Sequence, residues 1–105
     1  MLNTTKFNDF LIITPRSNHF NRKFRFPNGY GASVICEPGS YGYEEGLWEM
    51  ACLEFHSQDN SDFTIVYPKD SSFEFDVRGY LREPEVIALL DEISSMPNNS
   101  ALVIH

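Results

Sequence analysis

The sequence has little positive charge and no long apolar run. Eight Lys and Arg residues stand against fifteen Asp and Glu residues, so the formal net charge is −7. This acidity opposes direct binding of nucleic acid or an anionic membrane by phosphate neutralisation, and it favours a partner with a basic surface. No run of about 18 apolar residues exists, so we expect no transmembrane helix. The first residues also lack the charged and apolar regions of a signal peptide, and we expect a cytoplasmic protein.

Cysteine and histidine are scarce, and their spacing favours neither a metal site nor a catalytic pair. Cys36 and Cys52 lie in separate expected strands, and their spacing matches no zinc pattern, so we expect buried free thiols. His19, His56 and His105 share no ligand-like spacing. Cys52 and His56 are four positions apart on one expected strand, about 13 Å by strand rise. The sequence therefore predicts no catalytic residue, no metal site and no cofactor.

Aromatic residues are plentiful, with nine Phe, five Tyr and one Trp among 105 residues. Such side chains bury large areas, and surplus ones often anchor interfaces. Apolar residues make up 42% and charged residues 22%, which is typical of a folded globular domain. We therefore expect residues 1–105 to form a single domain with a modest core.

Residues 24–55 read as the centre of a small antiparallel sheet. The dipeptide Asn28-Gly29 predicts a hairpin with a type I′ turn, whose two central residues need positive φ. Residues 32–36 and 47–55 are rich in β-branched, apolar and aromatic residues. Both faces of residues 47–55 carry apolar side chains, which predicts a central strand covered on each side over part of its length.

Further strands are expected on both sides of this centre. Residues 8–14 form a short apolar run that predicts a buried strand. Residues 20–26 place Phe20, Phe24 and Phe26 on one face. Residues 63–67 also have strand character, and residues 73–77 alternate with three apolar side chains facing inward (Phe73, Phe75 and Val77). The apolar tail 101–104 suggests a final strand.

One helix is expected over about residues 83–96. Pro84 suits the first helical turn, and Glu83 and Glu85 suit its positive dipole end. A single apolar stripe follows, formed by Val86, Leu89, Leu90, Ile93 and Met96. The predicted fold class is therefore α+β, a small antiparallel sheet of about four to six strands covered on one face by a C-terminal amphipathic helix.

The candidate partner-binding residues gather in two acidic segments. Residues 37–46 contain three glycines, the stiff amphipathic residues Tyr41 and Tyr43, and the carboxylates of Glu37, Glu44 and Glu45. A second acidic, turn-like segment contributes Asp59 and Asp62. Residues 37–46 either form a partner-binding loop or serve as a long hairpin connection closed by packed tyrosines.

A cluster of basic residues interrupts the acidic sequence. Arg16, Arg22, Lys23 and Arg25 lie within ten positions. A solvated sheet face is the simpler interpretation, because surfaces normally intersperse both signs of charge. The alternative is a nucleic-acid binder that uses Arg22, Lys23 and Arg25 with the neighbouring phenylalanines.

Three motifs together resemble a known group of proteins. They are FPNGYGASVI at residues 26–35, GLWEMA at residues 46–51, and GYL at residues 79–81 ahead of Glu85-Val86. This pattern is similar to that of small bacteriophage and prophage proteins. The resemblance implies a phage setting in the host bacterial cytoplasm rather than a particular reaction. Residues 1–18 and 63–76 depart from the group's pattern, so a function specific to this chain is expected to involve them.

These observations predict a non-catalytic protein-binding module. The expected partner is a host or defence protein with a basic surface, which the module inhibits in the manner of anti-CRISPR or anti-restriction proteins. The alternative is a self-associating accessory protein, a homodimer formed through aromatic edge strands. A nucleic-acid binder is the third interpretation.

Overall fold

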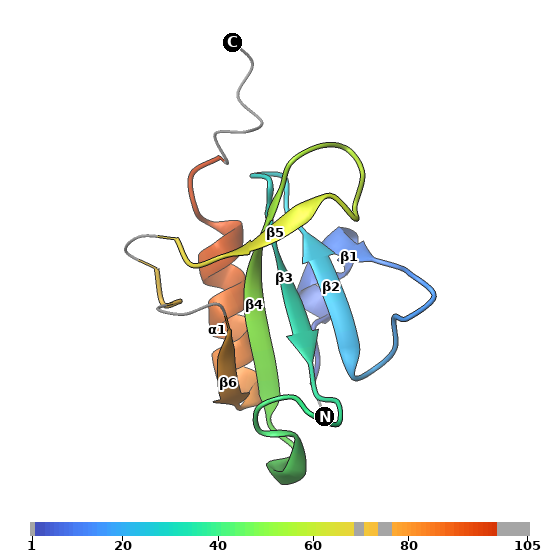
Figure 1. The fold of residues 1–105 in the computed structure, drawn as a ribbon. Helices are drawn as coiled ribbons and strands as arrows, with labels where there is room; N and C mark the ends of the chain where they lie inside the picture. Colours follow the sequence, from blue (N-terminus) through green and yellow to red (C-terminus); the bar gives the residue numbers. More distant parts are fainter. Residues whose placement is uncertain (1, 69–70, 74–76, 99–105) are drawn as a thin grey trace.

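A computed structural model describes residues 2–68, 71–73 and 77–98 of the chain. It shows one antiparallel sheet with strands in the order β1-β2-β3-β4-β5, and with β6 paired to β4 beside β5 (Figure 1). The strands are β1 (Leu11–Ile12), β2 (Asn21–Arg25), β3 (Tyr30–Ile35), β4 (Trp48–Phe55), β5 (Phe63–Val66) and β6 (Arg78–Leu81). The helix α1 (Glu83–Ser94) packs on the sheet. The predicted α+β class is confirmed.

The long strand β4 is the centre of the sheet. It pairs with β3 along one edge, while β5 and β6 share the other edge. Met50 and Cys52 belong to the core cluster beneath α1, whereas Leu53 and Phe55 belong to a second cluster. Because successive side chains of a strand point to opposite faces, β4 contributes to both clusters. The prediction of a strand covered on each side is confirmed.

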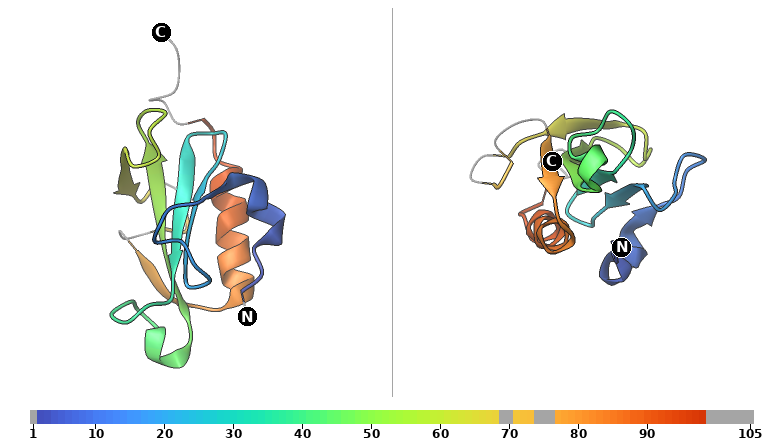
Figure 2. Two further views of the ribbon diagram at one scale, coloured as in Figure 1. Left: turned by 90° about the vertical axis from the view of Figure 1, so that its right-hand side faces the viewer. Right: turned by 90° about the horizontal axis from the view of Figure 1, so that it is seen from below.

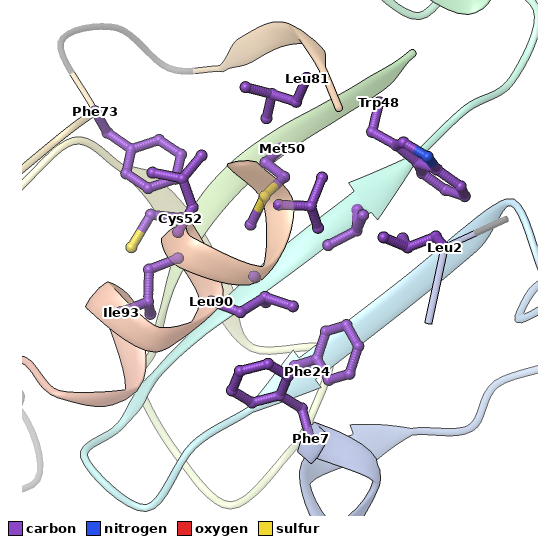
Figure 3. Close-up of a cluster of buried hydrophobic side chains, with 14 of the residues drawn as sticks. Leu2, Phe7, Phe24, Trp48, Met50, Cys52, Phe73, Leu81, Leu90 and Ile93 are labelled. Carbon is purple, nitrogen blue, oxygen red and sulfur yellow. The ribbon is translucent and has the colours of Figure 1, made fainter. Parts of the chain in front are cut away.

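Helix α1 and the 3-10 helix η1 (Thr5–Phe10) cover the same face of the sheet (Figure 2). The α1 stripe of Val86, Leu89, Leu90 and Ile93 is buried in the main core (Figure 3). Such burial contributes about 1.5–3 kcal/mol for each side chain. The Glu85 carboxylate accepts a hydrogen bond from the Arg82 backbone N–H at 3.0 Å, which satisfies a donor ahead of the first turn.

The hairpin between β2 and β3 is confirmed, but its predicted turn type is wrong. The Gly29 N–H donates to the Phe26 carbonyl at 3.0 Å, and the Phe26 N–H donates to the Tyr30 carbonyl at 2.8 Å. Gly29 has a φ of 87°, whereas Tyr80 is the only non-glycine with positive φ among the described residues, so Asn28 is not in the left-handed region. The observed turn runs from Phe26 to Gly29, and Pro27 at its first central position holds φ near −65°, which excludes type I′. The loop is a three-residue connection that ends in a left-handed glycine.

The predicted strand over residues 8–14 is wrong for most of its length. Residues 5–10 form η1, and only Leu11 and Ile12 pair with β2. The spacing of Phe7 and Phe10 explains the helix, because residues three apart share one face of a 3-10 helix. Both rings meet Phe26 edge-on, at centroid distances of 6.1 and 5.4 Å.

Strand β6 was not predicted, and its middle residues make a close contact with the connection between β3 and β4. Its residues Arg78 and Leu81 lie opposite Met50 and Trp48. A Cβ atom on Gly79 would lie 2.3 Å from the Tyr41 Cβ, so this position requires glycine. Two predicted strands, 73–77 and 101–104, fall wholly or partly outside the described residues. Phe73 is described, and it is buried as predicted.

Both cysteines are buried free thiols, as predicted. Cys52 lies opposite Ala32 in the β3–β4 register, whereas Cys36 follows the end of β3. Four residue steps along the extended chain therefore separate the two positions, about 13 Å by strand rise. This separation is too long for a disulfide.

Candidate functional site

The connection between β3 and β4 folds beside the start of β2 and forms a groove of about 650 Å³. We call it the β3–β4 groove. It is lined by Asn18, Phe20, Cys36, Glu37, Pro38, Tyr43, Glu44 and Gly46. Three of the predicted partner-binding residues, Glu37, Tyr43 and Glu44, therefore share one site. The connection itself projects from the end of the sheet at the bottom of Figure 1.

Phe20 is a groove residue that sequence reasoning missed. It was expected on one face of a strand with Phe24 and Phe26, but it precedes β2, which begins at Asn21, and it is 58% exposed. The Phe20 carbonyl accepts a hydrogen bond from the Cys36 N–H at 2.9 Å, so Phe20 extends the β2–β3 pairing by one residue at the edge of the sheet, where a tight backbone bridge between Asn18 and Asn21 turns the chain. The Phe20 ring stacks on Trp48, with ring centroids 6.4 Å apart and planes inclined by 18°. The only signal in the sequence is the turn-forming pair Asn18 and Asn21 around it.

Hydrogen bonds hold the groove wall in a defined shape. The Ser40 hydroxyl donates to the Glu37 carbonyl at 2.7 Å and accepts from the Glu37 N–H at 3.0 Å. The 3-10 helix η2 (Tyr43–Glu45) follows, and the Leu47 N–H closes the loop onto the Gly42 carbonyl at 2.9 Å. Gly42 has a φ of 94°, and a Cβ there would lie 2.9 Å from the Leu47 Cβ. The carboxylates are thus presented by an ordered loop.

The groove is negatively charged. The Glu37 carboxylate accepts a hydrogen bond from the Asn21 side-chain amide at 3.2 Å, and Glu44 is exposed. Within the described part of the chain, the one salt bridge joins Lys6 to Asp91, so no described cation pairs with Glu37 or Glu44. Cys36 contributes no charge, because burial raises the pKa of its thiol. The groove therefore combines two unneutralised carboxylates with the exposed rings of Phe20 and Tyr43.

The remaining loop residues lie outside the groove. Tyr41 faces β6, where its carbonyl accepts from the Tyr80 N–H at 3.3 Å and its N–H donates to the Glu49 carboxylate at 2.9 Å. Tyr41 and Tyr80 are both more than half exposed. Glu45 ends η2 and is exposed, but it does not line the groove. The predicted loop residues therefore divide between two sides of the connection.

Asp59 and Asp62 lie at the opposite end of β4, in the loop that leads to β5. The seven residue steps from Trp48 to Phe55 span about 23 Å, so these carboxylates do not reach the groove. The Asp59 carboxylate accepts hydrogen bonds from the Ser61 N–H at 2.8 Å and the Ser61 hydroxyl at 2.7 Å. These bonds lower the pKa of Asp59. Asp59 thus has a local structural role in this turn.

The basic residues of β2 divide between the two faces of the sheet. Arg22 lies on the α1 face, where its guanidinium sits 5.8 Å from the Trp48 ring and donates to the Thr4 hydroxyl at 2.9 Å. Partial burial lowers the pKa of Arg22, and the carboxylate of Glu83 opposes this shift. Lys23 lies on the other face with Arg25, and its ammonium sits 4.9 Å from the Phe63 ring centroid.

Arg25 is occupied by internal contacts. Its guanidinium lies 4.6 Å from the Phe55 ring centroid and donates to the Ser57 carbonyl at 2.6 Å and the Asn60 side chain at 3.0 Å. It therefore ties β2 to the loop between β4 and β5. Because Arg22 and Arg25 point to opposite faces, the three cations do not form one surface along a nucleic-acid backbone.

The Cys52 thiol is held in an unreactive environment. Burial raises the pKa of the Cys52 thiol to about 12, with smaller contributions from the carboxylates of Glu54 and Glu92. A thiol with this pKa is protonated at neutral pH and is not a nucleophile. The His56 ring nitrogen Nε2 lies 2.9 Å from the Thr64 hydroxyl. Across residues 2–68, 71–73 and 77–98, no group of three or more His, Cys, Asp or Glu side chains could hold a metal ion.

Comparisons with models of protein families, with curated proteins and with solved structures found no match. The resemblance to small phage and prophage proteins therefore stays a prediction. Within the described residues, no helix has the length and hydrophobicity that a membrane span requires.

Proposed function

We propose that this protein is a non-catalytic protein-binding module that holds a basic segment of its partner in the β3–β4 groove. One observation carries the proposal. The carboxylates of Glu37 and Glu44 line a groove with the exposed rings of Phe20 and Tyr43, and no described cation neutralises them. A binding site built in this way selects for positive charge.

An arginine side chain fits this combination of groups best. Its planar guanidinium pairs with carboxylates through two parallel hydrogen bonds and stacks on aromatic rings. One face of Phe20 already stacks on Trp48, and the ring remains 58% exposed. A partner guanidinium placed against the exposed part of Phe20 would lie within reach of the groove carboxylates. Cation–π attraction adds about 0.5–2 kcal/mol at such sites, depending on how far the cation is desolvated.

The partner we propose is a host or defence protein that acts on nucleic acid. Such proteins carry basic clefts, and a small domain with a net charge of −7 is attracted to them over long range. Occupation of the cleft would inhibit the partner, as expected for proteins of the anti-CRISPR or anti-restriction class. The proposed setting is the cytoplasm of a bacterial host.

A matched pair of charge reversals tests this proposal. The tagged protein captures its partner from bacterial lysate at low salt, and the affinity for the purified partner is then measured by calorimetry. We expect Glu44→Lys to weaken binding at least tenfold. Asp62→Lys makes the same change of charge at the far end of β4, and we expect it to weaken binding less than threefold at physiological salt.

Two further results would bear on the proposal. Phe20→Ala, which removes the exposed ring but no charge, should also weaken binding if the groove is the site. Equal losses from Glu44→Lys and Asp62→Lys would show that only overall charge matters, and the groove would be rejected. If the unaltered protein captures no protein that the Glu44→Lys variant fails to capture, the protein-binding function itself would be rejected.

A further inference from the structure

Strand β5 is an edge strand that carries no charge. It ends the strand order, and its four residues pair with Cys52–Phe55 of β4. The left view of Figure 2 shows it at the outer side of the sheet. Residues 63–67 read Phe-Thr-Ile-Val-Tyr, all good strand formers. Natural edge strands are usually short or protected by charges, because an open edge is a template for pairing with another strand.

The backbone hydrogen bonds show which groups of β5 face outward. The His56 N–H donates to the Asp62 carbonyl at 2.9 Å, so the Asp62 carbonyl points toward the β4 side. Backbone groups alternate in direction along a strand, so those of Thr64 and Val66 point the same way. Those of Phe63, Ile65 and Tyr67 therefore point away from β4. The Phe55 N–H donates to the Gly29 carbonyl, so the backbone groups of Phe55 point toward the β3 side and away from Phe63. This direction agrees with the assignment.

The outward-facing residues carry apolar side chains, of which Ile65 and Tyr67 are exposed and Phe63 is half-buried. Phe63 and Ile65 lie opposite Phe55 and Leu53, on the face away from α1. Ile65 is 48% exposed and Tyr67 is 57% exposed. No described residue forms a hydrogen bond with the outward backbone groups of Phe63 or Ile65. The edge thus offers both unpaired backbone groups and apolar side chains.

We propose that β5 pairs with β5 of a second copy of this chain, antiparallel and about a two-fold axis at Ile65. In this register Ile65 lies opposite Ile65 of the other copy, and Phe63 lies opposite Tyr67. All three positions already point their backbone groups outward, so each facing pair exchanges two hydrogen bonds. The interface is self-complementary, as a two-fold axis requires.

Charge selects the antiparallel arrangement of the two copies. In a parallel pair, Asp62 of one copy would lie beside Asp62 of the other, and like charges in register are destabilising. In the antiparallel pair about Ile65, Asp62 lies opposite Pro68 instead. The β3–β4 groove is at the other end of β4, so both grooves stay open in the dimer. Because each copy carries a net charge of −7, we expect salt to strengthen the dimer.

Sedimentation velocity over a range of concentrations, at 150 and 500 mM salt, tests the dimer. We expect a concentration-dependent dimer that Ile65→Lys weakens at least tenfold, because two ammonium groups would then face each other across the axis. Thr64→Lys adds the same charge to the same strand but on its other face, and we expect a change below threefold. Circular dichroism and urea unfolding confirm that both variants are folded.

Disulfide trapping tests the register. Facing residues that exchange hydrogen bonds have Cα atoms about 5.5 Å apart, within disulfide range. Ile65→Cys should therefore cross-link two copies under mild oxidation, whereas Thr64→Cys should not, because Thr64 lies opposite Val66 and diagonal to its own counterpart. The native cysteines are buried, and both variants contain them, so any cross-linking through them is the same background in both measurements. The proposal would be overturned if the protein stayed monomeric at every concentration and salt. It would also be overturned if Ile65→Lys left the dimer unaffected, or if the two cysteine variants cross-linked equally.

Discussion

Asn28 and Ile93 are 65 positions apart, and one hydrogen bond joins them: the Asn28 side-chain amide donates to the Ile93 carbonyl at 2.8 Å. The same nitrogen donates to the Met96 carbonyl at 3.1 Å, and the side-chain oxygen accepts from the Tyr30 N–H at 3.0 Å. Asn28 is only 6% exposed. The turn between β2 and β3 thus caps the C-terminal end of α1, whose last carbonyls have no partner within the helix.

Asn28→Ala should lower the free energy of unfolding by about 2–3 kcal/mol, because the carbonyls of Ile93 and Met96 and the Tyr30 N–H lose this side-chain partner in a buried or partly buried setting. Urea unfolding followed by circular dichroism measures this. Asn8→Ala is the control, since Asn8 is exposed and its side chain bonds to no described residue. A loss below about 0.5 kcal/mol for Asn28→Ala would show that water replaces the amide without cost.

Two glycines with the same backbone angle separate strain from packing in the groove wall. Gly39 has a φ of 93° and open space around it, whereas Gly42 has a φ of 94° and lies against Leu47 and Tyr80. We expect Gly39→Ala to cost about 1–2 kcal/mol from the left-handed backbone alone. Gly42→Ala adds overpacking of about 1–3 kcal/mol. Thermal or urea unfolding measures both, and equal losses would mean that the wall moves to accommodate the new methyl group.

The Asp59 carboxyl should titrate below the ordinary aspartate range, because Ser61 donates two hydrogen bonds to its charged form. Carbon-detected NMR across the acid range measures its midpoint. Ser61→Ala removes the hydroxyl donor and should raise this midpoint. A folded-state pKa below the unfolded value adds stability above the unfolded pKa, and that stability is lost as pH falls through the folded pKa. An unchanged midpoint in Ser61→Ala would contradict the assigned cause.

Cys52 should resist thiol reagents in the folded protein. Its side chain is fully buried, and its pKa is raised to about 12. In a Cys36→Ser variant, we expect labelling of Cys52 only on unfolding, so its rate should rise with urea. The raised pKa also means that the unfolded thiol ionises first at alkaline pH. Stability is therefore unaffected below the unfolded pKa and falls as pH rises from there toward about 12. Rapid labelling in native buffer would contradict this environment.

Local patterns in the sequence predicted the helix and most of the strands. The spacing of Val86, Leu89, Leu90 and Ile93 is a helical stripe whatever lies beneath it, and all four are buried. Strand β6 was missed because its four residues include Gly79 and Tyr80, and its pairing partner is β4, some thirty positions earlier. The predicted length of the N-terminal strand was wrong, because an apolar run alone does not distinguish a strand from a short helix.

The candidate site was predicted in part. Glu37, Tyr43 and Glu44 were chosen for charge and rigidity, and they line one groove. Phe20 directly precedes β2, and only the pairing of β2 with β3 brings it beside them. Asp59 and Asp62 have similar chemistry, but the length of β4 places them at the other end of the sheet.

The sequence by itself determined the acidic charge, the amphipathic helix and the long apolar strand, because each of these depends on neighbouring residues. Only the tertiary structure decided that Asn28 caps α1, that Phe20 joins Glu44 in a groove, and that Ile65 turns its backbone outward. These relationships depend on strand register and on contacts between distant segments. Register is set by the packing of the whole sheet, and a shift of one residue would move every side chain to the opposite face.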